Sequence, residues 1–234
     1  MDTMSEQGKA PGALGRMWRW LRRPAVAVAS GTLLVVGIAL GVAGWGGFNW
    51  AMELTNTEGF CISCHEMEQN VFVEYRTTPH YSNRTGVRAT CPDCHVPKDW
   101  VHKVLRKVQA TNELYHHFLG SVSTPEKFKA KRLELATNVW KGMKRTDSRE
   151  CRNCHDFKSM DLSTQEGRAS NLHQKALESG GTCIDCHRGI AHQLPAGADA
   201  AVAKLYQALG YKLAHEEGYF KGNGGNGGNG GNGQ

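Results

Sequence analysis

The stretch of sequence that decides the fold is Cys61-Ile-Ser-Cys-His65-Glu-Met67. Two cysteines three positions apart, with a histidine directly after the second, form the attachment pattern of haem c. The thiols add to the two haem vinyl groups as thioethers, and the histidine beside them can reach the iron. Four copies of the pattern use every cysteine of the chain, and we expect these residues to attach haem: Cys61, Cys64, Cys91, Cys94, Cys151, Cys154, Cys183 and Cys186.

Structural zinc is the competing interpretation, because such cysteine pairs are also half of a four-cysteine zinc site. Zinc does not require a histidine after every second cysteine, whereas here one follows all four: His65, His95, His155 and His187. The pattern therefore favours four haem c groups. About 180 residues follow the apolar N-terminal segment, or roughly 45 per haem, which is too few to wrap each haem in an ordinary apolar core. We expect the haems to form most of the core, packed on short helices and loops.

The apolar N-terminal segment has the length of a membrane span. Residues 24–52 carry no charge, and the most apolar part, 25–45, would be about 31 Å long as a helix. The apolar region of a signal peptide is usually shorter, at about 7–15 residues, so we expect an uncleaved anchor. Its many glycines argue against a buried helix of a soluble domain, since glycine is common in membrane helices.

Arginines cluster before this segment, which places the N-terminus in the cytoplasm by the positive-inside rule. We expect a single pass through a bacterial inner membrane, with a cytoplasmic head (1–23), an anchor helix (24–50), a periplasmic haem domain (51–221) and a disordered Gly/Asn tail (222–234). The formal net charge of +6 does not indicate nucleic-acid binding. Part of it belongs to the head, haem propionates offset the rest, and no basic stripe interleaved with aromatics is present.

Two helices are expected between the second and third motifs. Residues 99–119 show an apolar period close to 3.6, and Thr124 caps a second helix with Pro125 at its first position. We interpret their apolar stripes as packing against haems, which gives a mainly α fold. The first cysteines of successive motifs are 30, 60 and 32 residues apart, a spacing that suggests two haem pairs.

A haem iron with two histidine ligands needs a second, distal histidine, commonly far away in sequence. The residues themselves leave seven candidates open: His80, His102, His116, His117, His173, His192 and His215. In the first motif, Met67 lies two residues after His65 and could replace it on the same face of the iron.

Several segments, including ones outside the haem motifs, resemble the NapC/NirT family. They are CISCHEM, HYSNRTGVRATCPDCHVPKDW, TPEKFKAKRLELA, DSRECRNCH and TCIDCHRGIAHQLP. Members of that family are membrane-anchored tetrahaem cytochromes c that oxidise membrane quinol and feed periplasmic reductases. The resemblance implies quinol dehydrogenase activity toward menaquinol or ubiquinol, and a role in nitrate respiration through the periplasmic nitrate reductase or its small dihaem subunit.

The resemblance also implies a ligand set and a quinol site. Met67 would ligate haem 1, leaving His65 off the iron, while the other three haems would be held by His95 with His192, His155 with His80, and His187 with His173. Lys107 and Glu113 occupy the positions that border the quinol pocket, and we expect partial burial to raise the pKa of Glu113. Two alternatives stay open: a quinone reductase working in the opposite direction, and a membrane-tethered electron relay without quinone chemistry.

Overall fold

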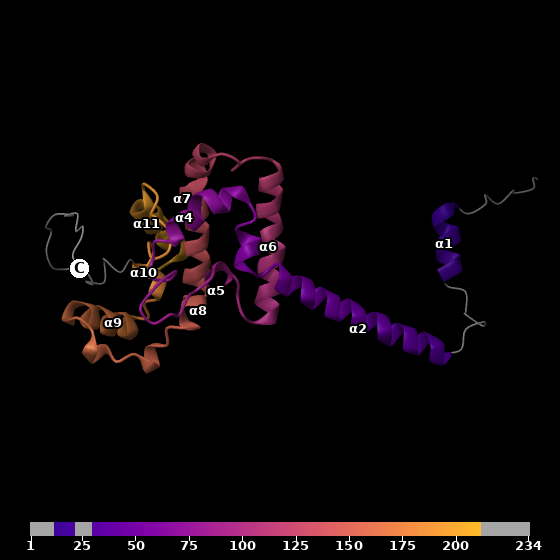
Figure 1. The fold of residues 1–234 in the computed structure, drawn as a ribbon, viewed down its shortest axis with the longest axis horizontal. Coiled ribbons are helices and arrows are strands. Elements are labelled where there is room, and N and C mark those ends of the chain that lie inside the picture. The colour runs from indigo at the N-terminus through magenta and orange to yellow at the C-terminus, as the bar shows by residue number, and fades with distance from the viewer. Residues whose placement is uncertain (1–11, 22–29, 212–234) are drawn as a thin grey trace, which may run out of the picture. The chain divides into compact units, whose positions relative to one another are not determined.

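The structure is a computed structural model that describes residues 12–21 and 30–211. The predicted Gly/Asn tail, His215, most of the predicted head and the first residues of the predicted anchor lie outside the described residues. Every regular element in the described part is a helix, as Figure 1 shows, and this confirms the mainly α fold.

The chain divides into two units, Met1–Ala51 and Met52–Gln234. The first contains α1 (Ala13–Leu21) and most of α2 (Ser30–Leu54), whose last three residues belong to the second unit. Within α2, residues 31–54 form a helix long and apolar enough to cross a membrane, and no residue of its most apolar stretch is buried against protein. At 25 residues α2 is about 38 Å long, so it exceeds the hydrocarbon thickness of a bilayer. It continues to Leu54, past the predicted end at residue 50, because residues 48–54 contain no proline or glycine to stop it.

Each haem motif of the second unit starts on a short helix: α3 (Glu58–Cys61), α5 (Cys91–His95), α8 (Arg149–Arg152) and α10 (Cys183–Cys186). Threonine caps three of them. Thr90 and Thr182 form capping boxes with Asp93 and Asp185, the residues between the two cysteines. The capping boxes fix the direction in which the second and fourth motifs enter their helices.

The two long helices lie where the apolar pattern predicts them. Helix α6 (Trp100–Phe118) begins after the N-cap Asp99, and α7 (Pro125–Arg145) begins after Thr124, whose hydroxyl accepts a hydrogen bond from the Lys127 amide. Helix α7 buries Phe128 and Trp140. Helix α6 buries no residue, so its apolar stripe remains exposed in the polypeptide, with Phe118 at 84%.

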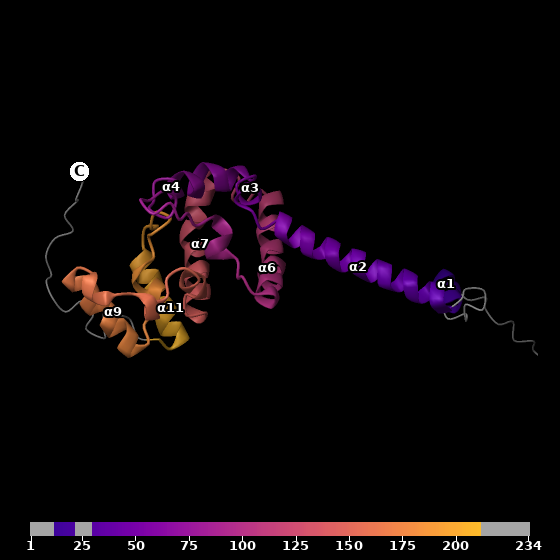
Figure 2. The same ribbon diagram turned by 60° about the horizontal axis from the view of Figure 1, so that its bottom comes forward.

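The remaining elements are short helices around the motifs and two C-terminal helices. They are η1 (Met67–Phe72, a π-helix), α4 (Val73–Tyr75), the 3-10 turns η2 (Phe157–Ser159) and η3 (Leu162–Thr164), α9 (Gly167–Ser179) and α11 (Ala198–Leu209). Helix α11 packs along α7, as Figures 1 and 2 both show.

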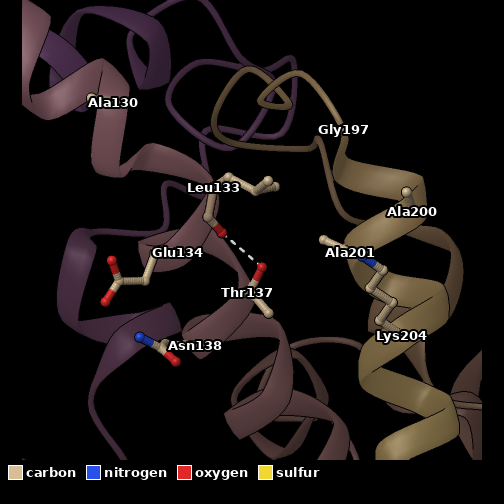
Figure 3. Close-up of a pocket in the computed structure, with 9 residues that line it drawn as sticks. All are labelled: Ala130, Leu133, Glu134, Thr137, Asn138, Gly197, Ala200, Ala201 and Lys204. Atoms are coloured by element: carbon tan, nitrogen blue, oxygen red, sulfur yellow. Dashed lines mark hydrogen bonds between the residues drawn. The ribbon is translucent and has the colours of Figure 1, made fainter.

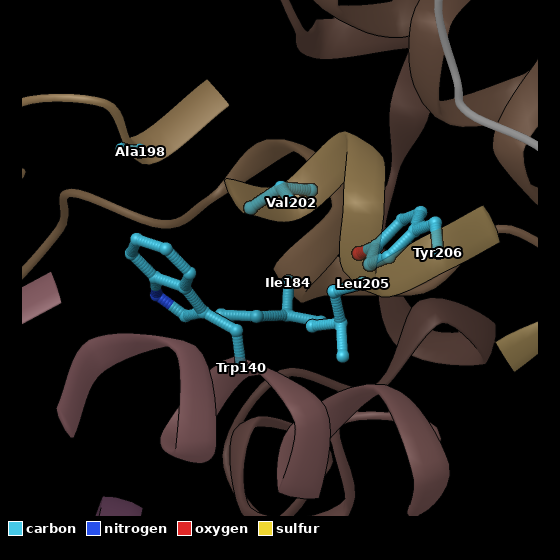
Figure 4. Close-up of a cluster of buried hydrophobic side chains, with 6 residues drawn as sticks. All are labelled: Trp140, Ile184, Ala198, Val202, Leu205 and Tyr206. Carbon is cyan, nitrogen blue, oxygen red and sulfur yellow. The ribbon is translucent and has the colours of Figure 1, made fainter. Parts of the chain in front are cut away.

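An apolar protein core forms where α7, α10 and α11 meet. Trp140 from α7 faces Ile184, which lies inside the fourth motif, and α11 closes the cluster (Figure 4). Its members are Trp140, Ile184, Ala198, Val202, Leu205 and Tyr206. The fourth motif is therefore anchored in protein as well as positioned for haem.

A groove of about 620 Å³ lies between α7 and α11 (Figure 3). Leu133 and Thr137 face Ala200 and Ala201 across it, and Glu134 and Lys204 are at its edge. None of the residues that line it is a predicted haem ligand or quinol-site residue, so we assign it no role in the chemistry below.

Candidate haem-binding and quinol site

All eight cysteines lie in the described residues, and all are free thiols. The first cysteines lie in neighbouring pairs: the Cys61 thiol is beside that of Cys91, and the Cys151 thiol is beside that of Cys183. Helix α5 contacts α8, which links the second motif to the third. The four motifs thus follow one another as two neighbouring pairs, in agreement with their short, long, short spacing.

Three pairs of imidazoles face each other across gaps of similar width. The ring centroids are 6.3 Å apart for His95 and His192, 6.1 Å for His80 and His155, and 6.1 Å for His173 and His187. A metal ion bound at about 2 Å to one nitrogen of each ring would hold the two centroids about 6 Å apart. These are the three pairs that the family resemblance implies, each joining a motif histidine to a distant one.

Burial favours the neutral, metal-binding form of four of the six paired histidines. Burial lowers the pKa of His95 to about 4, and burial also lowers the pKa values of His80, His187 and His192. A neutral imidazole has a nitrogen lone pair to give to a metal. For His173, Nδ1 is 2.6 Å from Gln165 Oε1, so the other ring nitrogen is left for the iron.

A fourth pair lies at the first motif and includes His117, the first further candidate among the histidines that the resemblance leaves without a partner. The His65 and His117 ring centroids are 6.3 Å apart. Between them is Glu66, 5% exposed, whose carboxylate accepts a hydrogen bond from His117 Nδ1 and lies 3.4 Å from His65 Nε2. Met67, the predicted ligand, is 37% exposed at the start of η1. Of the other candidate distal histidines, which the resemblance pairs with no haem, His116 contacts Ser121 and His102 contacts Asp99.

Lys107 reaches back to the segment that follows the membrane helix. Its Nζ donates to the carbonyl oxygen of Thr55 at 2.5 Å and to the Thr55 hydroxyl at 3.1 Å, and it lies 6.0 Å from the centre of the Phe60 ring. Burial lowers the pKa of this ammonium group. Lys107 is therefore close to the first motif, beside the end of the anchor helix.

Glu113 differs from the expectation. It pairs with Arg106 at 2.7 Å, and its side chain is 61% exposed, so the expected partial burial is wrong. The reason is that Arg106, which also donates to the carbonyl of His95, holds the carboxylate on the outer side of α6. As their spacing on the helix predicts, Lys107 and Glu113 have separate partners and do not bond to each other.

The residues present fit covalently bound haem. No cysteine forms a disulfide, and every motif histidine faces a second imidazole. The long helices also keep apolar side chains exposed. Thiols spaced for thioether attachment, with imidazoles facing them in pairs, are the chemistry of a c-type cytochrome, and the long apolar helix α2 makes it a membrane-anchored one.

The comparisons with known proteins give the family. The family model described as the N-terminal region of the NapC/NirT cytochrome c family matches residues 23–197, and the chain belongs to this family. It is 52% identical over 192 residues to the cytochrome c-type protein NapC of Escherichia coli K12, covering 82% of this chain and 96% of that protein. It is 58% identical over 177 residues to the denitrification system component NirT of Stutzerimonas stutzeri, covering 76% of this chain and 88% of that protein.

A third relative is longer. The chain is 43% identical over 181 residues to the cytochrome c-type protein TorC of E. coli K12, which covers 77% of this chain but 46% of TorC. No solved structure gave a significant match. Family membership establishes a membrane-anchored, haem c-containing electron-transfer protein.

Proposed function

We propose that the protein oxidises membrane quinol and passes the electrons to a periplasmic reductase. The observation that carries this is the position of Lys107: a half-buried ammonium group beside the first haem motif, bonded to Thr55 just after the membrane helix. A quinol that leaves the bilayer at this end of α2 meets a hydrogen-bond donor next to an electron acceptor.

Covalently bound haem supplies one-electron acceptors when present, with ligands drawn from the motifs and the facing histidines. Quinol gives up two electrons and two protons, so the site also needs groups that handle protons. Lys107 would donate a hydrogen bond to a quinol oxygen and favour its deprotonation. Glu113, exposed beside Arg106, would accept the proton and release it to external water.

The reductase that accepts the electrons is proposed from the relatives. Relatives named NapC at 50–54% identity favour a nitrate reductase or its small dihaem subunit. The relative named as a denitrification component at 58% identity favours a second candidate, a reductase of another denitrification step. We propose a bacterial inner-membrane location with the N-terminus in the cytoplasm and the haem domain in the periplasm, since the arginines precede the span.

Stopped-flow mixing of the oxidised protein with menaquinol and with ubiquinol tests the quinol site. We expect haem reduction within seconds, slowed at least about 10-fold in Lys107→Ala and by a smaller factor in Glu113→Gln, in proteins that keep four haems. Lys103→Ala is the matched control, because Lys103 lies one turn earlier on α6 and bonds to Glu53 instead of Thr55. Equal slowing in both lysine variants would contradict the role of Lys107, and no reduction of a protein that dithionite fully reduces would favour the relay.

A further inference from the structure

Helix α1 carries apolar residues on one side and arginines on the other. Leu14, Met17 and Trp18 are spaced to share one side, and they are 78%, 54% and 56% exposed. At about 100° per residue, Arg16 and Arg19 lie on the opposite side of the helix. We propose that α1 lies along the membrane surface, with its apolar side in the lipid and its arginines bound to the headgroups of anionic phospholipids.

The chain keeps α1 close to the membrane that holds α2. Helix α1 ends at Leu21 and α2 begins at Ser30, so only residues 22–29 separate them. A stretch of that length reaches at most about 30 Å when fully extended. Because α2 is the membrane-spanning helix, an exposed apolar surface tethered this near to its start is within reach of the bilayer surface. The lipid is therefore the partner that the chain itself brings to α1.

The length of α1 also favours a lipid partner. The helix has 9 residues, and isolated helices shorter than about 12–15 residues are marginal in water. A helix with one apolar and one basic side is stabilised at a membrane interface, where the apolar side is buried and the basic side stays in water. Helix α2 differs because it is apolar on all sides and has no charge before Glu53. The two helices thus suit two positions, α2 across the membrane and α1 on its surface.

The charges around α1 indicate which lipids it binds. Four arginines lie between residues 16 and 23, and the sequence has no acidic residue from 7 to 52 to neutralise them. Nε of Arg19 donates to the Gly15 carbonyl at 3.4 Å, which leaves the two terminal nitrogens of the guanidinium for another acceptor. A guanidinium group binds phosphate oxygens in a bidentate manner. An anionic headgroup supplies both the phosphate and the net negative charge, whereas phosphatidylcholine supplies no net charge.

The test is hydrogen exchange, followed by mass spectrometry, of the full-length haem-loaded protein in lipid nanodiscs. One nanodisc contains phosphatidylcholine alone, and the other also contains phosphatidylglycerol. Three double variants are compared with the wild type: Arg16→Gln with Arg19→Gln, Arg16→Lys with Arg19→Lys, and Lys129→Gln with Arg145→Gln. The last pair is the control, since it removes the same charge from exposed positions of α7. Glutamine and lysine form helices about as well as arginine does, so the substitutions do not disturb α1 by propensity.

We expect the anionic lipid to slow amide exchange in α1 by at least about 10-fold, because each basic residue at an anionic surface strengthens binding about fivefold. The glutamine variant should lose at least about fivefold of this slowing. The lysine variant, which keeps the charge, and the α7 control should both retain it. Salt should also weaken the effect, since charges at a surface are screened over about 3 Å at 1 M.

Three results would overturn the proposal. Equal exchange of α1 in the two nanodiscs, with α2 protected in both, would show that anionic headgroups are not what α1 binds. Full slowing in the glutamine variant would remove Arg16 and Arg19 from the contact. A loss of slowing in the α7 control as large as in the glutamine variant would mean that only the total charge of the protein matters.

Discussion

The first and the fourth haem motifs have the same pattern but different surroundings. At the fourth, Ile184 is buried in the cluster with Trp140 and Tyr206, and Asp185 receives hydrogen bonds from Lys144 at 2.9 Å and Tyr206 at 2.5 Å. At the first, the preceding Phe60 is 46% exposed, and the buried group that follows is the carboxylate of Glu66. The fourth motif is packed into a protein core. The first motif has exposed apolar neighbours that only a non-protein group could cover.

The difference shows what stabilises each half of the haem domain, where the N-terminal half is the part up to the end of α6 and the C-terminal half is the part from α7 on. A buried apolar side chain contributes about 1.5–3 kcal/mol, so the cluster around Trp140 gives the C-terminal half several such contributions. Helix α6 receives no such contribution from the polypeptide, because it buries no residue. Its apolar stripe, with Leu105 at 53% and Val108 at 62% exposure, needs haem or lipid to cover it. We therefore expect the N-terminal half to depend on haem 1 and the C-terminal half to be partly self-sufficient.

Removal of the first haem gives the largest expected effect. In a Cys61→Ala, Cys64→Ala protein we expect amide exchange in α6 to accelerate by on the order of 100-fold, because the group that its apolar side packs against is lost. Helices α7 and α11 should keep most of their protection. Hydrogen exchange followed by mass spectrometry measures both regions in one sample.

The matched variant is Cys183→Ala, Cys186→Ala, which removes the fourth haem. There we expect protection of α7 and α11 to fall much less, since Trp140 and Val202 stay packed against Ile184. Equal losses of protection in the two proteins would contradict the contrast between the motifs.

The second prediction concerns the apolar core formed by α7, α10 and α11. Trp140 is 4% exposed, and Trp140→Ala should lower the free energy of unfolding by about 3–5 kcal/mol through lost burial and the cavity left behind. Denaturant titration of the haem-loaded protein, followed by haem absorbance, measures it. Leu135→Ala on the same helix is the control, because Leu135 is 38% exposed and should cost about 1 kcal/mol or less. Similar losses in both variants would mean that α7 is stabilised by haem alone.

Much of this organisation is predictable from sequence, for physical reasons that differ between regions. The Cys-x-x-Cys-His pattern specifies haem attachment chemistry directly, and Asp99, Thr124 and Pro125 mark where α6 and α7 begin because capping is local. His80 and His155 face each other although they are far apart in the chain. Local sequence patterns do not predict such a pair, and only the family resemblance implied it.

Features that depend on tertiary contacts were missed. Glu66 reads as an ordinary charge in the sequence, and its burial against His117 arises because α6 returns past the first motif. The partial burial expected for Glu113 is wrong for the same kind of reason, since Arg106, about two turns earlier on α6, bonds to the carboxylate at the surface.

The smallest predicted effect concerns the junction between the two halves. Glu74 in α4 receives two hydrogen bonds from Arg132 of α7 and one from the backbone amide of Gln193, beside the facing histidine of the second pair. Burial alone would raise the pKa of the Glu74 carboxyl, but these hydrogen bonds and the Arg132 charge outweigh it, so the pKa is below its ordinary value. Glu74→Gln should cost about 2 kcal/mol at neutral pH, because Arg132 loses its counter-charge while it remains largely buried.

The pH dependence distinguishes this junction from a simple packing defect. Because the folded-state pKa of Glu74 is lowered, its contribution is fully present above the ordinary carboxyl pKa of about 4.5 and is lost as the pH falls through the folded value. The difference in unfolding free energy between wild type and Glu74→Gln should therefore shrink as the pH falls below about 4.5. Denaturant titrations at pH 7 and in acid measure it. A constant difference would mean that the carboxylate charge is unimportant there, and that the two halves are joined by shape alone.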